Sequence, residues 1–334
     1  MVSAVIFVAT SCVSPLTGFA FWETNLAYEG ESIYNYLQVK NLSDRTILST
    51  NVLFGVQSVT MKDKGLTGMY YDTALAAPAL ADNANSALIL GMGTGTYARQ
   101  LKQYYPKMNI TGVEIDQKIT DLAGEYFDEP ADIPVTTYDG RAWLAASHDK
   151  YDVIMVDAYQ DITIPFQMSS TEFFTMVREH LNPGGVMVVN MNMISDGQGS
   201  INEALSDTIA SVFGNGNTLT ADGPDTTNRE LFAKKPGSGS EENSMQQASK
   251  ALNLRETTYE RTGSEDLEWY MEEVASRFRK VNEPDSASTI LTDDKAPVEV
   301  LGMHAIDQII ADEAGPYRQI LKDEGFGGLL RAVQ

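Results

Sequence analysis

The chain has 334 residues, 43% of them hydrophobic and 21% charged, which is typical of a globular protein with one large domain or two modest ones. Its 24 lysines and arginines against 46 aspartates and glutamates give a formal net charge of −22, which argues against nucleic-acid binding. A single cysteine, Cys12, excludes a disulfide within the chain, and with only three scattered histidines no metal site is predicted.

Residues 2–21 form an apolar stretch without a charged side chain, and the first basic residue is Lys40. The stretch is close to the length of about 20 residues that a membrane-spanning helix needs, and Trp22 at its end would suit the membrane interface. A secretory signal peptide would begin with positively charged side chains. We therefore favour a membrane-proximal segment over a buried pair of strands, and both over a signal peptide.

The next region is rich in short β-type runs. Strands are predicted within 32–42, 45–51 and 55–61, because β-branched and aromatic residues gather there between Asn, Asp, Ser and Gly. A helix is predicted over 70–80, and Pro78 limits its regularity.

From residue 86 onward, apolar strand-like runs alternate with helix-like stretches. The predicted strands are 86–90, 109–115, 134–138, 152–158 and 186–191, and the predicted helices are 96–105, 117–127, 140–147, 170–181 and 200–213. Runs that are apolar on both faces are typical of central parallel strands covered by helices. The pattern therefore predicts a doubly wound α/β sheet.

The last part of the chain is more polar. Residues 234–250 are rich in Gly and Ser and read as a surface linker, 263–280 form an amphipathic helix, and a final helix is predicted from about 303 to 313. The predicted organisation is an apolar segment 1–21, a β-rich domain 22–80, a nucleoside-binding core 81–236, a polar linker 237–262 and a helical segment 263–334.

A glycine-rich loop, "GMGTG", connects the first predicted strand of the core to a helix. Gly91, Gly93 and Gly95 allow a tight turn and let a ligand approach the backbone closely. Their spacing departs from the dinucleotide-binding pattern because Thr96 stands in place of the last glycine. The loop alone is therefore a weak signal.

Two acidic residues at neighbouring strand ends strengthen this signal. Glu114 follows Gly91 by 23 residues, at the end of the second strand, where a carboxylate can accept both ribose hydroxyls. Asp139, after the third strand, can accept from an adenine amino group or can cap the following helix. With no P-loop motif in the chain and no Lys or Arg within the glycine loop before Arg99, an S-adenosyl compound fits better than a nucleotide.

The fourth strand brings a candidate catalytic group to the same edge of the sheet. Asp157 ends the buried run "YDVIMVD" and could accept a proton from an attacking ammonium group. Desolvation would raise the pKa of its carboxyl group, and a bound cation would oppose that shift. The alternative is an aspartate that only caps or orders the loop.

Together these residues make the chain resemble the spermidine synthase (polyamine aminopropyltransferase) family. Within this family it is most similar to bacterial members that are often fused to a membrane-embedded N-terminal part. The resemblance covers nearly all of 32–300. It is carried by "GVQSVT", "YYD", "LILGMGTGT", "VEID", "YDGRAWL", "VDAYQDITIPF", "LNPGGVMVVN" and "LTDDKAPVE". Several of these are general to S-adenosylmethionine-type Rossmann domains, whereas "VDAYQDITIPF" together with the β region is more specific.

This resemblance implies a small N-terminal β domain on a Rossmann-like, methyltransferase-type core, a homodimer, and a cytoplasmic catalytic domain anchored to the membrane through its N-terminus. It implies aminopropyl transfer from decarboxylated S-adenosylmethionine to putrescine or a related amine. Asp157 would be the base. The donor would contact Gln57, Gly91, Gly93, Gly95, Glu114, Asp139 and Gly140, and the amine would contact Tyr70, Tyr71, Asp72, Tyr159 and Asp161.

Two departures from the family pattern concern the groups that bind amines. Thr94 stands where the family usually has an aspartate for the aminopropyl ammonium, and "DAYQD" replaces the usual D-S-S-D-P, so that Asp161 falls one residue late. Two other functions therefore stay open, a methyltransferase that uses intact S-adenosylmethionine and a non-catalytic nucleoside- or polyamine-binding module. Asp293 and Asp294 could reach the cleft, but a capping or domain-closing role is favoured.

Overall fold

The structure of the protein is a computed structural model. It describes residues 23–51, 55–128, 130–159, 164–192, 197, 199–224, 227–237, 253–303 and 322. The apolar segment 2–21, Asp161 and nearly all of the helix predicted at 303–313 lie outside these residues. Within the described part of the chain, no helix combines the length and the apolar character that crossing a membrane requires.

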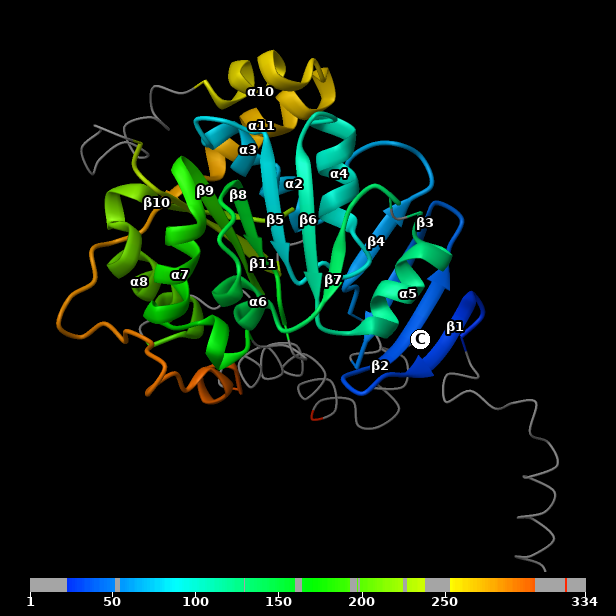
Figure 1. Cartoon of the computed structure of the whole chain (residues 1–334), viewed down its shortest axis with the longest axis horizontal. Coiled ribbons are helices and arrows are strands. Elements are labelled where there is room, and N and C mark those ends of the chain that lie inside the picture. Colours follow the sequence, from blue (N-terminus) through cyan, green and yellow to red (C-terminus); the bar gives the residue numbers. More distant parts are fainter. Residues whose placement is uncertain are drawn as a thin grey trace, which may run out of the picture.

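Two β-sheets organise the molecule (Figure 1). The smaller is a four-stranded antiparallel meander in the order β1-β2-β3-β4. Its strands are β1 (Leu26–Glu31), β2 (Tyr36–Asn41), β3 (Arg45–Thr50) and β4 (Ser58–Met61). The predicted strands at 32–42, 45–51 and 55–61 correspond to β2, β3 and β4, whereas β1 was not predicted.

The larger sheet has eight strands in the order β12-β10-β11-β9-β8-β5-β6-β7. The five predicted core strands are confirmed as β5 (Ser86–Leu90), β6 (Asn109–Glu114), β7 (Val135–Thr137), β8 (Tyr151–Val156) and β9 (Leu181–Asn192), all parallel. Three antiparallel strands follow beyond β9, namely β11 (Asn228–Lys234), β10 (Thr218–Asp222) and β12 (Arg279–Lys280). The strand order reverses between β5 and β8, so the carboxyl ends of these two strands flank a topological switch point.

Helices cover both faces of the larger sheet, as runs apolar on both faces predict. Along β8, Val153 and Met155 face one core while Ile154 and Val156 face the other. The first core is covered by α2 (Tyr70–Ala74), α3 (Ala76–Leu80), α4 (Thr96–Tyr104), α10 (Leu254–Thr262) and α11 (Glu265–Arg277). The second is covered by α6 (Gly140–Ala146), α7 (Thr171–His180) and α8 (Ile201–Phe213).

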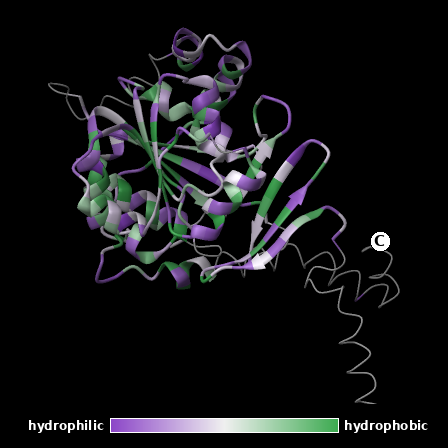
Figure 2. Ribbon diagram, turned by 45° about the vertical axis from the view of Figure 1, so that its right-hand side comes forward, coloured by the Kyte–Doolittle hydropathy of each residue, from purple (hydrophilic) through white to green (hydrophobic). Residues whose placement is uncertain are grey.

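Helix α5 (Gln117–Tyr126) joins the two sheets. Its Ile119 and Leu122, with Phe127 just beyond, pack on Leu37 and Leu48 of the small sheet. Figure 1 shows α5 lying against β1–β3, and Figure 2 shows hydrophobic residues in green concentrated in the central strands. The small sheet therefore stands beside the carboxyl ends of β6 and β7.

The helix predicted over 70–80 is interrupted at Leu75, between α2 and α3. Pro78 lacks an N–H, and its ring would clash with the carbonyl of Ala74, four residues earlier. In the first turn of α3, however, a proline is tolerated because that N–H has no partner within the helix. The predicted limit on regularity is thus confirmed.

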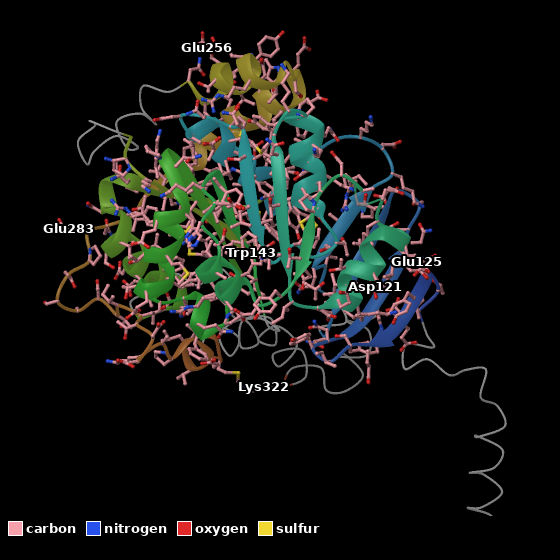
Figure 3. All side chains as sticks on the ribbon, in the orientation of Figure 1. Asp121, Glu125, Trp143, Glu256, Glu283 and Lys322 are labelled. Carbon is pink, nitrogen blue, oxygen red and sulfur yellow. The ribbon has the colours of Figure 1, made fainter. Side chains whose placement is uncertain are left out.

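Residues 237–262 were predicted as a polar linker, but their last nine residues form α10. Leu254 and Thr258, one turn apart, are buried, while Glu256 points to solvent. Figure 3 shows Asp121 and Glu125 on the outer side of α5, with Glu256 and Glu283 at the periphery of the molecule. These exposed carboxylates illustrate how part of the acidic excess is carried at the surface.

Candidate active site

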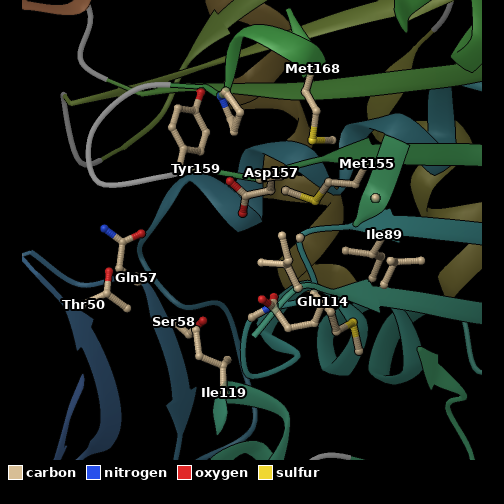
Figure 4. Close-up of a pocket in the computed structure, with 18 of the residues that line it drawn as sticks. Thr50, Gln57, Ser58, Ile89, Glu114, Ile119, Met155, Asp157, Tyr159 and Met168 are labelled. Atoms are coloured by element: carbon tan, nitrogen blue, oxygen red, sulfur yellow. The ribbon is translucent and has the colours of Figure 1, made fainter. Parts of the chain in front are cut away.

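A cavity of about 330 Å³ lies at the carboxyl ends of β5, β6 and β8, beside the switch point of the large sheet. Figure 4 shows Asp157 and Glu114 on the side of the large sheet, with Gln57 and Thr50 on the side of the small sheet. Ten of the predicted site residues line this cavity: Gln57, Tyr70, Tyr71, Gly91, Gly93, Glu114, Asp139, Gly140, Asp157 and Tyr159. Side chains more than 80 residues apart in the sequence are therefore gathered in one place.

The glycine loop between β5 and α4 sets the spacing between strands β5 and β8. Gly91 has a φ of +88°, and a Cβ atom there would lie 2.3 Å from the backbone oxygen of Asp157. On the same strand pair, the Asp157 N–H donates to the Leu90 carbonyl at 2.9 Å. Only glycine fits this position, because it allows both the positive φ and the close approach of the Asp157 segment.

Glu114, at the end of β6, is 7% exposed and holds the glycine loop. One carboxylate oxygen accepts from the Gly93 N–H at 2.8 Å, and the other accepts from the Asp116 N–H at 3.0 Å. Burial raises the pKa of the Glu114 carboxyl, while these backbone N–H groups oppose the shift. Each oxygen still has a lone pair for another donor, such as a hydroxyl in the cavity.

Asp139 and Gly140 line the cavity at the start of α6. The Asp139 carboxylate accepts from the Ala142 N–H at 2.7 Å, so it caps this helix. Asp139 therefore caps α6, as one of the two interpretations predicted, and its second carboxylate oxygen is available for a ligand. Tyr138 beside it is 55% exposed and forms part of the cavity wall.

Asp157 lies just beyond β8 and receives two hydrogen bonds. The Tyr70 hydroxyl donates to one carboxylate oxygen at 2.7 Å, and the Asn190 side-chain amide donates to the other at 2.9 Å. Burial raises the pKa of the Asp157 carboxyl to about 7, and the two donors limit the rise. A carboxyl group that titrates near neutral pH can both accept and release a proton under physiological conditions.

Two adjacent tyrosines from α2 form the wall beside Asp157. The rings of Tyr70 and Tyr71 lie 4.0 Å apart between centroids, and the Tyr71 hydroxyl donates to the Gln57 carbonyl at 2.7 Å. Burial and the nearby Asp157 raise the pKa of the Tyr70 hydroxyl well above its ordinary value, so it stays a donor. The Tyr159 hydroxyl donates to the backbone carbonyl of Asn190.

Three predicted site residues do not line the cavity as described. Asp72 is 1% exposed and accepts from the Thr67 N–H at 2.9 Å, from the Thr67 hydroxyl, from the Gly68 N–H and from the Gln100 side chain. It orders the turn before α2, so its position differs from the predicted one. Gly95, with a φ of +82°, ends the glycine loop as the first residue before α4, and Asp161 lies outside the described residues.

The threonines of the glycine loop bind the small sheet. The Thr96 hydroxyl donates to the Val59 carbonyl at 2.8 Å and accepts from the Val59 N–H at 2.9 Å. The Thr94 N–H donates to the Ser58 hydroxyl at 3.2 Å, and the Thr94 side chain is fully buried outside the cavity lining. Both residues therefore attach β4 to the loop that the glycines shape.

A second link between the sheets lies at the tip of the β1–β2 hairpin. The Ser32 hydroxyl and the Asn35 amide donate to the Asp116 carboxylate at 2.5 and 3.0 Å. Asp116 is buried and also caps α5 through the Lys118 N–H. The hairpin tip is thus bonded to the turn that carries Glu114.

Asn190 is a site residue that the sequence reasoning missed. It stands at the carboxyl end of the apolar run of β9, next to Asp157, and it is 3% exposed. The signal was the same one that identified Asp157, a polar residue that ends a buried parallel strand.

Asp293 does not reach the cavity lining. It forms a two-pronged ion pair with Arg141, with N–O distances of 2.7 and 2.6 Å, and it accepts from the Ser170 hydroxyl at 2.5 Å. Arg141 also donates to the Gln167 carbonyl at 2.8 Å, next to the cavity. Asp293 thus bonds the tail of the chain to α6 and to the start of α7. The Arg141 guanidinium holds the pKa of the Asp293 carboxyl below its ordinary value. Among the described residues, no cluster of three or more His, Cys, Asp or Glu side chains could hold a metal ion.

Comparisons with known proteins identify a family for the chain. Residues 69–221 match the family described as "Spermine/spermidine synthase domain". A protein of Bifidobacterium longum named "Probable polyamine aminopropyl transferase" is 99% identical over 334 residues, which is all of this chain and 75% of that protein. The chain belongs to the polyamine aminopropyltransferase family. Membership makes it a transferase of the spermidine synthase class.

The chain is also similar to more distant relatives and to solved structures. A polyamine aminopropyltransferase of Vibrio vulnificus is 28% identical over 209 residues, covering 60% of this chain and 69% of that protein. The crystal structure of a probable spermidine synthase from Corynebacterium glutamicum superposes with a TM-score of 0.55 at 20% identity, covering 78% of this chain and 98% of that one. A spermidine synthase solved with the transition state analogue AdoDATO gives 0.52 at 20% identity, covering 63% and 74%. These two structures share the fold described above.

Proposed function

We propose that the protein transfers an aminopropyl group from decarboxylated S-adenosylmethionine to putrescine or a related amine, with Asp157 as the base. The observation that carries this proposal is the Asp157 carboxyl, whose pKa is raised to about 7 at the carboxyl end of β8 and which receives donors from Tyr70 and Asn190. It lies in the same cavity as the glycine loop and Glu114.

The nucleoside part of the donor would occupy the side of the cavity formed by the glycine loop. Glu114 would accept the two ribose hydroxyls on oxygens that are already oriented by the Gly93 and Asp116 N–H groups. Asp139 and Gly140, at the start of α6, would lie against the adenine, and Gln57 would face the thioether side. A spermidine synthase of the same fold was solved with the transition state analogue AdoDATO, which supports an aminopropyl donor as the ligand of this fold.

The amine would approach Asp157 from the side of Tyr70 and Tyr71. Asp157 accepts a proton from the ammonium group, and the neutral nitrogen then attacks the methylene carbon next to the sulfonium. The new C–N bond forms as the C–S bond breaks, and the electron pair stays on sulfur, which leaves as neutral methylthioadenosine. The protein contributes orientation and a proton acceptor, because the sulfonium is already a good leaving group.

Methyl transfer from intact S-adenosylmethionine is a second candidate, and one observation favours it. Thr94, in the place where the family has a carboxylate for the aminopropyl ammonium, is buried without a charge. Residue 94 therefore supplies no carboxylate that would repel a donor with a carboxylate of its own. Family membership favours aminopropyl transfer of the two.

Mass spectrometry of the products tests the proposal. The protein is incubated with each donor and a panel of diamines and polyamines, and we expect an aminopropylated amine and methylthioadenosine only from the decarboxylated donor. Replacing the base in Asp157→Asn should lower turnover by about 10²- to 10⁴-fold, the usual contribution of a general base. Methylated products from intact S-adenosylmethionine would overturn the proposed reaction.

A matched control separates catalysis from folding. Asp152 also belongs to β8 but lies at its other end, where its carboxylate accepts from the Asn85 N–H at 2.8 Å and from Asn182. Asp152→Asn should lower stability while keeping the turnover of the folded fraction. Equal turnover losses in both variants would remove the role assigned to Asp157.

The homodimer and the membrane contact of residues 2–21 stay predictions. Sedimentation of the full chain, with and without lipid vesicles, tests both.

A further inference from the structure

Asp157, Asn190 and Asn228 lie in a row across three neighbouring strands. Val156 of β8 pairs with Val189 of β9, so the next residues, Asp157 and Asn190, are neighbours. In the antiparallel pair of β9 and β11, Asn228 faces Asn192, two residues beyond Asn190. Residues two apart on a strand share a face, so Asn190 and Asn228 are diagonal neighbours within side-chain reach.

Hydrogen bonds connect this row in one direction. The Thr227 hydroxyl donates to Asn228 Oδ1 at 2.8 Å, and Asn228 Nδ2 donates to Asn190 Oδ1 at 2.9 Å. Asn190 Nδ2 then donates to Asp157 Oδ1 at 2.9 Å. Both asparagines are buried, so water does not compete freely for their amides.

The direction of this chain follows from chemistry. An ionised carboxylate only accepts hydrogen bonds, so the amide of Asn190 must turn its NH₂ toward Asp157 and its oxygen toward Asn228. Asn228 must then offer its own NH₂ and turn its oxygen to Thr227, whose hydroxyl can donate. If the Asn190 amide were reversed, its oxygen would face the carboxylate and repel the ionised form.

We infer that Asn228 is a positioning residue of the reaction, which acts through Asn190 to keep an N–H donor on the Asp157 carboxylate. This inference rests on the proposed function, in which Asp157 is the base. Asn228 itself lies outside the cavity lining and is connected to Asp157 through the intervening amide of Asn190. Its effect is to favour the ionised, proton-accepting form of Asp157.

Other titratable groups also face Asp157. From α2 these are Tyr70, which donates to it, and Tyr71, whose pKa Asp157 raises. From β6 the Glu114 carboxylate disfavours ionisation of Asp157, and Tyr159 follows on the same segment. From β11, the buried Glu230 pairs with Asn190 across the two strands, next to Asn228. The hydrogen bonds from Asn228 to Asn190 and from Asn190 to Asp157 connect a change at Asn228 to the Asp157 carboxylate.

The test is the pH dependence of kcat/KM in Asn228→Asp and Asn228→Leu. The carboxylate introduced by Asn228→Asp would draw the NH₂ of Asn190 to itself and turn the amide oxygen toward Asp157. We expect the acidic limb of the profile to move up by about one pH unit, a loss of about fivefold at pH 7 that disappears near pH 9. Asn228→Leu frees the amide and should give a smaller shift in the same direction.

Two controls distinguish an effect through the Asn228–Asn190 hydrogen bond from an effect of the new charge and from a loss of folding. In an Asn190→Ala background, Asn228→Asp should produce no further shift, because the connecting amide is gone. Asn217, another buried asparagine, lies at the opposite edge of the same sheet and donates to the Phe213 carbonyl at 3.0 Å. Asn217→Asp should lower stability and leave the pH profile in place.

The inference fails if Asn228→Asp lowers activity equally at every pH, or if its shift persists in the Asn190→Ala background. Titration of ¹³C-labelled aspartate by NMR gives a reading that needs no turnover, with the Asp157 signal assigned by its loss in Asp157→Asn. An unchanged wild-type rate in Asp157→Asn would reject the proposed base. If the pKa of the Asp157 signal is unchanged in Asn228→Asp, the positioning role of Asn228 is rejected.

Discussion

The two ends of the cavity differ in which part of the chain forms them, mainly the backbone at the nucleoside end and side chains at the amine end. At the nucleoside end the shape depends mainly on the backbone, because the glycine loop bends at Gly91 and Gly93 and the N–H groups of Gly93 and Asp116 donate to Glu114. At the amine end side chains form the site, because the Asp157 carboxylate accepts hydrogen bonds from the hydroxyl of Tyr70 and the amide of Asn190. The first end is therefore sensitive to changes in backbone shape, and the second to changes in hydrogen-bonding groups.

Gly91→Ala should have the largest effect, because Gly91 is where the two ends meet. A Cβ atom would overlap the backbone of Asp157 and would also impose a side chain on a φ of +88°. We expect turnover to fall more than about 100-fold and stability to fall by about 2–4 kcal/mol. Steady-state rates and chemical denaturation measure both.

The control for this change is Gly124→Ala within α5, where a Cβ atom would meet nothing within 4 Å. Helix propensity alone predicts a gain of up to about 1 kcal/mol there. If Gly91→Ala kept wild-type turnover, the close contact between the two ends would have no functional meaning.

Glu114→Gln should weaken the nucleoside end and leave the amine end working. The NH₂ of the glutamine would have to face the N–H of Gly93 or of Asp116, so one donor loses its acceptor. We expect the KM for the donor and the Kd of methylthioadenosine to rise about tenfold, with kcat less affected. Isothermal calorimetry and steady-state kinetics measure these quantities.

The matched control is Glu125→Gln, because Glu125 lies on the exposed side of α5, away from the cavity. A loss confined to kcat in Glu114→Gln would contradict the division between the two ends.

Asp157→Asn should also change stability, with a sign set by the amine end. The folded-state pKa of about 7 lies above the ordinary 3.8, so the folded wild type holds more protons between these values and its stability falls as pH rises through them. The variant lacks this penalty. The free energy of unfolding of the variant relative to the wild type should therefore be higher at pH 8 than at pH 5, by about 1–2 kcal/mol after solvent screening. Melting curves recorded at the two pH values measure this difference.

Asp149→Asn, in an exposed position before β8, should show no such pH dependence. A constant difference in melting temperature between pH 5 and 8 would mean that Asp157 titrates near its ordinary pKa.

The core of the fold could be predicted because its strands are apolar on both faces. The apolar run 153–156 is typical of a buried strand, and its parallel neighbours follow the same pattern. The antiparallel strands β10 and β11 escaped prediction because buried polar residues interrupt them. Lys234 is paired with Asp82 and Arg229 with Asp222, partners that the linear sequence does not reveal.

The same reason separates the predictable site residues from the others. Glu114 and Asp157 end buried strands, so the sheet geometry alone places them at one edge. Asp72 lies at no such strand end, and its orientation depends in part on a donor from the Gln100 side chain, which lies 28 residues further along the chain. A side chain whose orientation is set by distant partners needs the folded structure.

The threonines of the glycine loop bear on how such a loop can change over evolution. Because the nucleoside end uses the backbone there, the side chains at 94 and 96 are available for other tasks, and Thr96 holds the small sheet through Val59. Substitutions at 94 and 96 can thus alter what surrounds the loop without altering its shape.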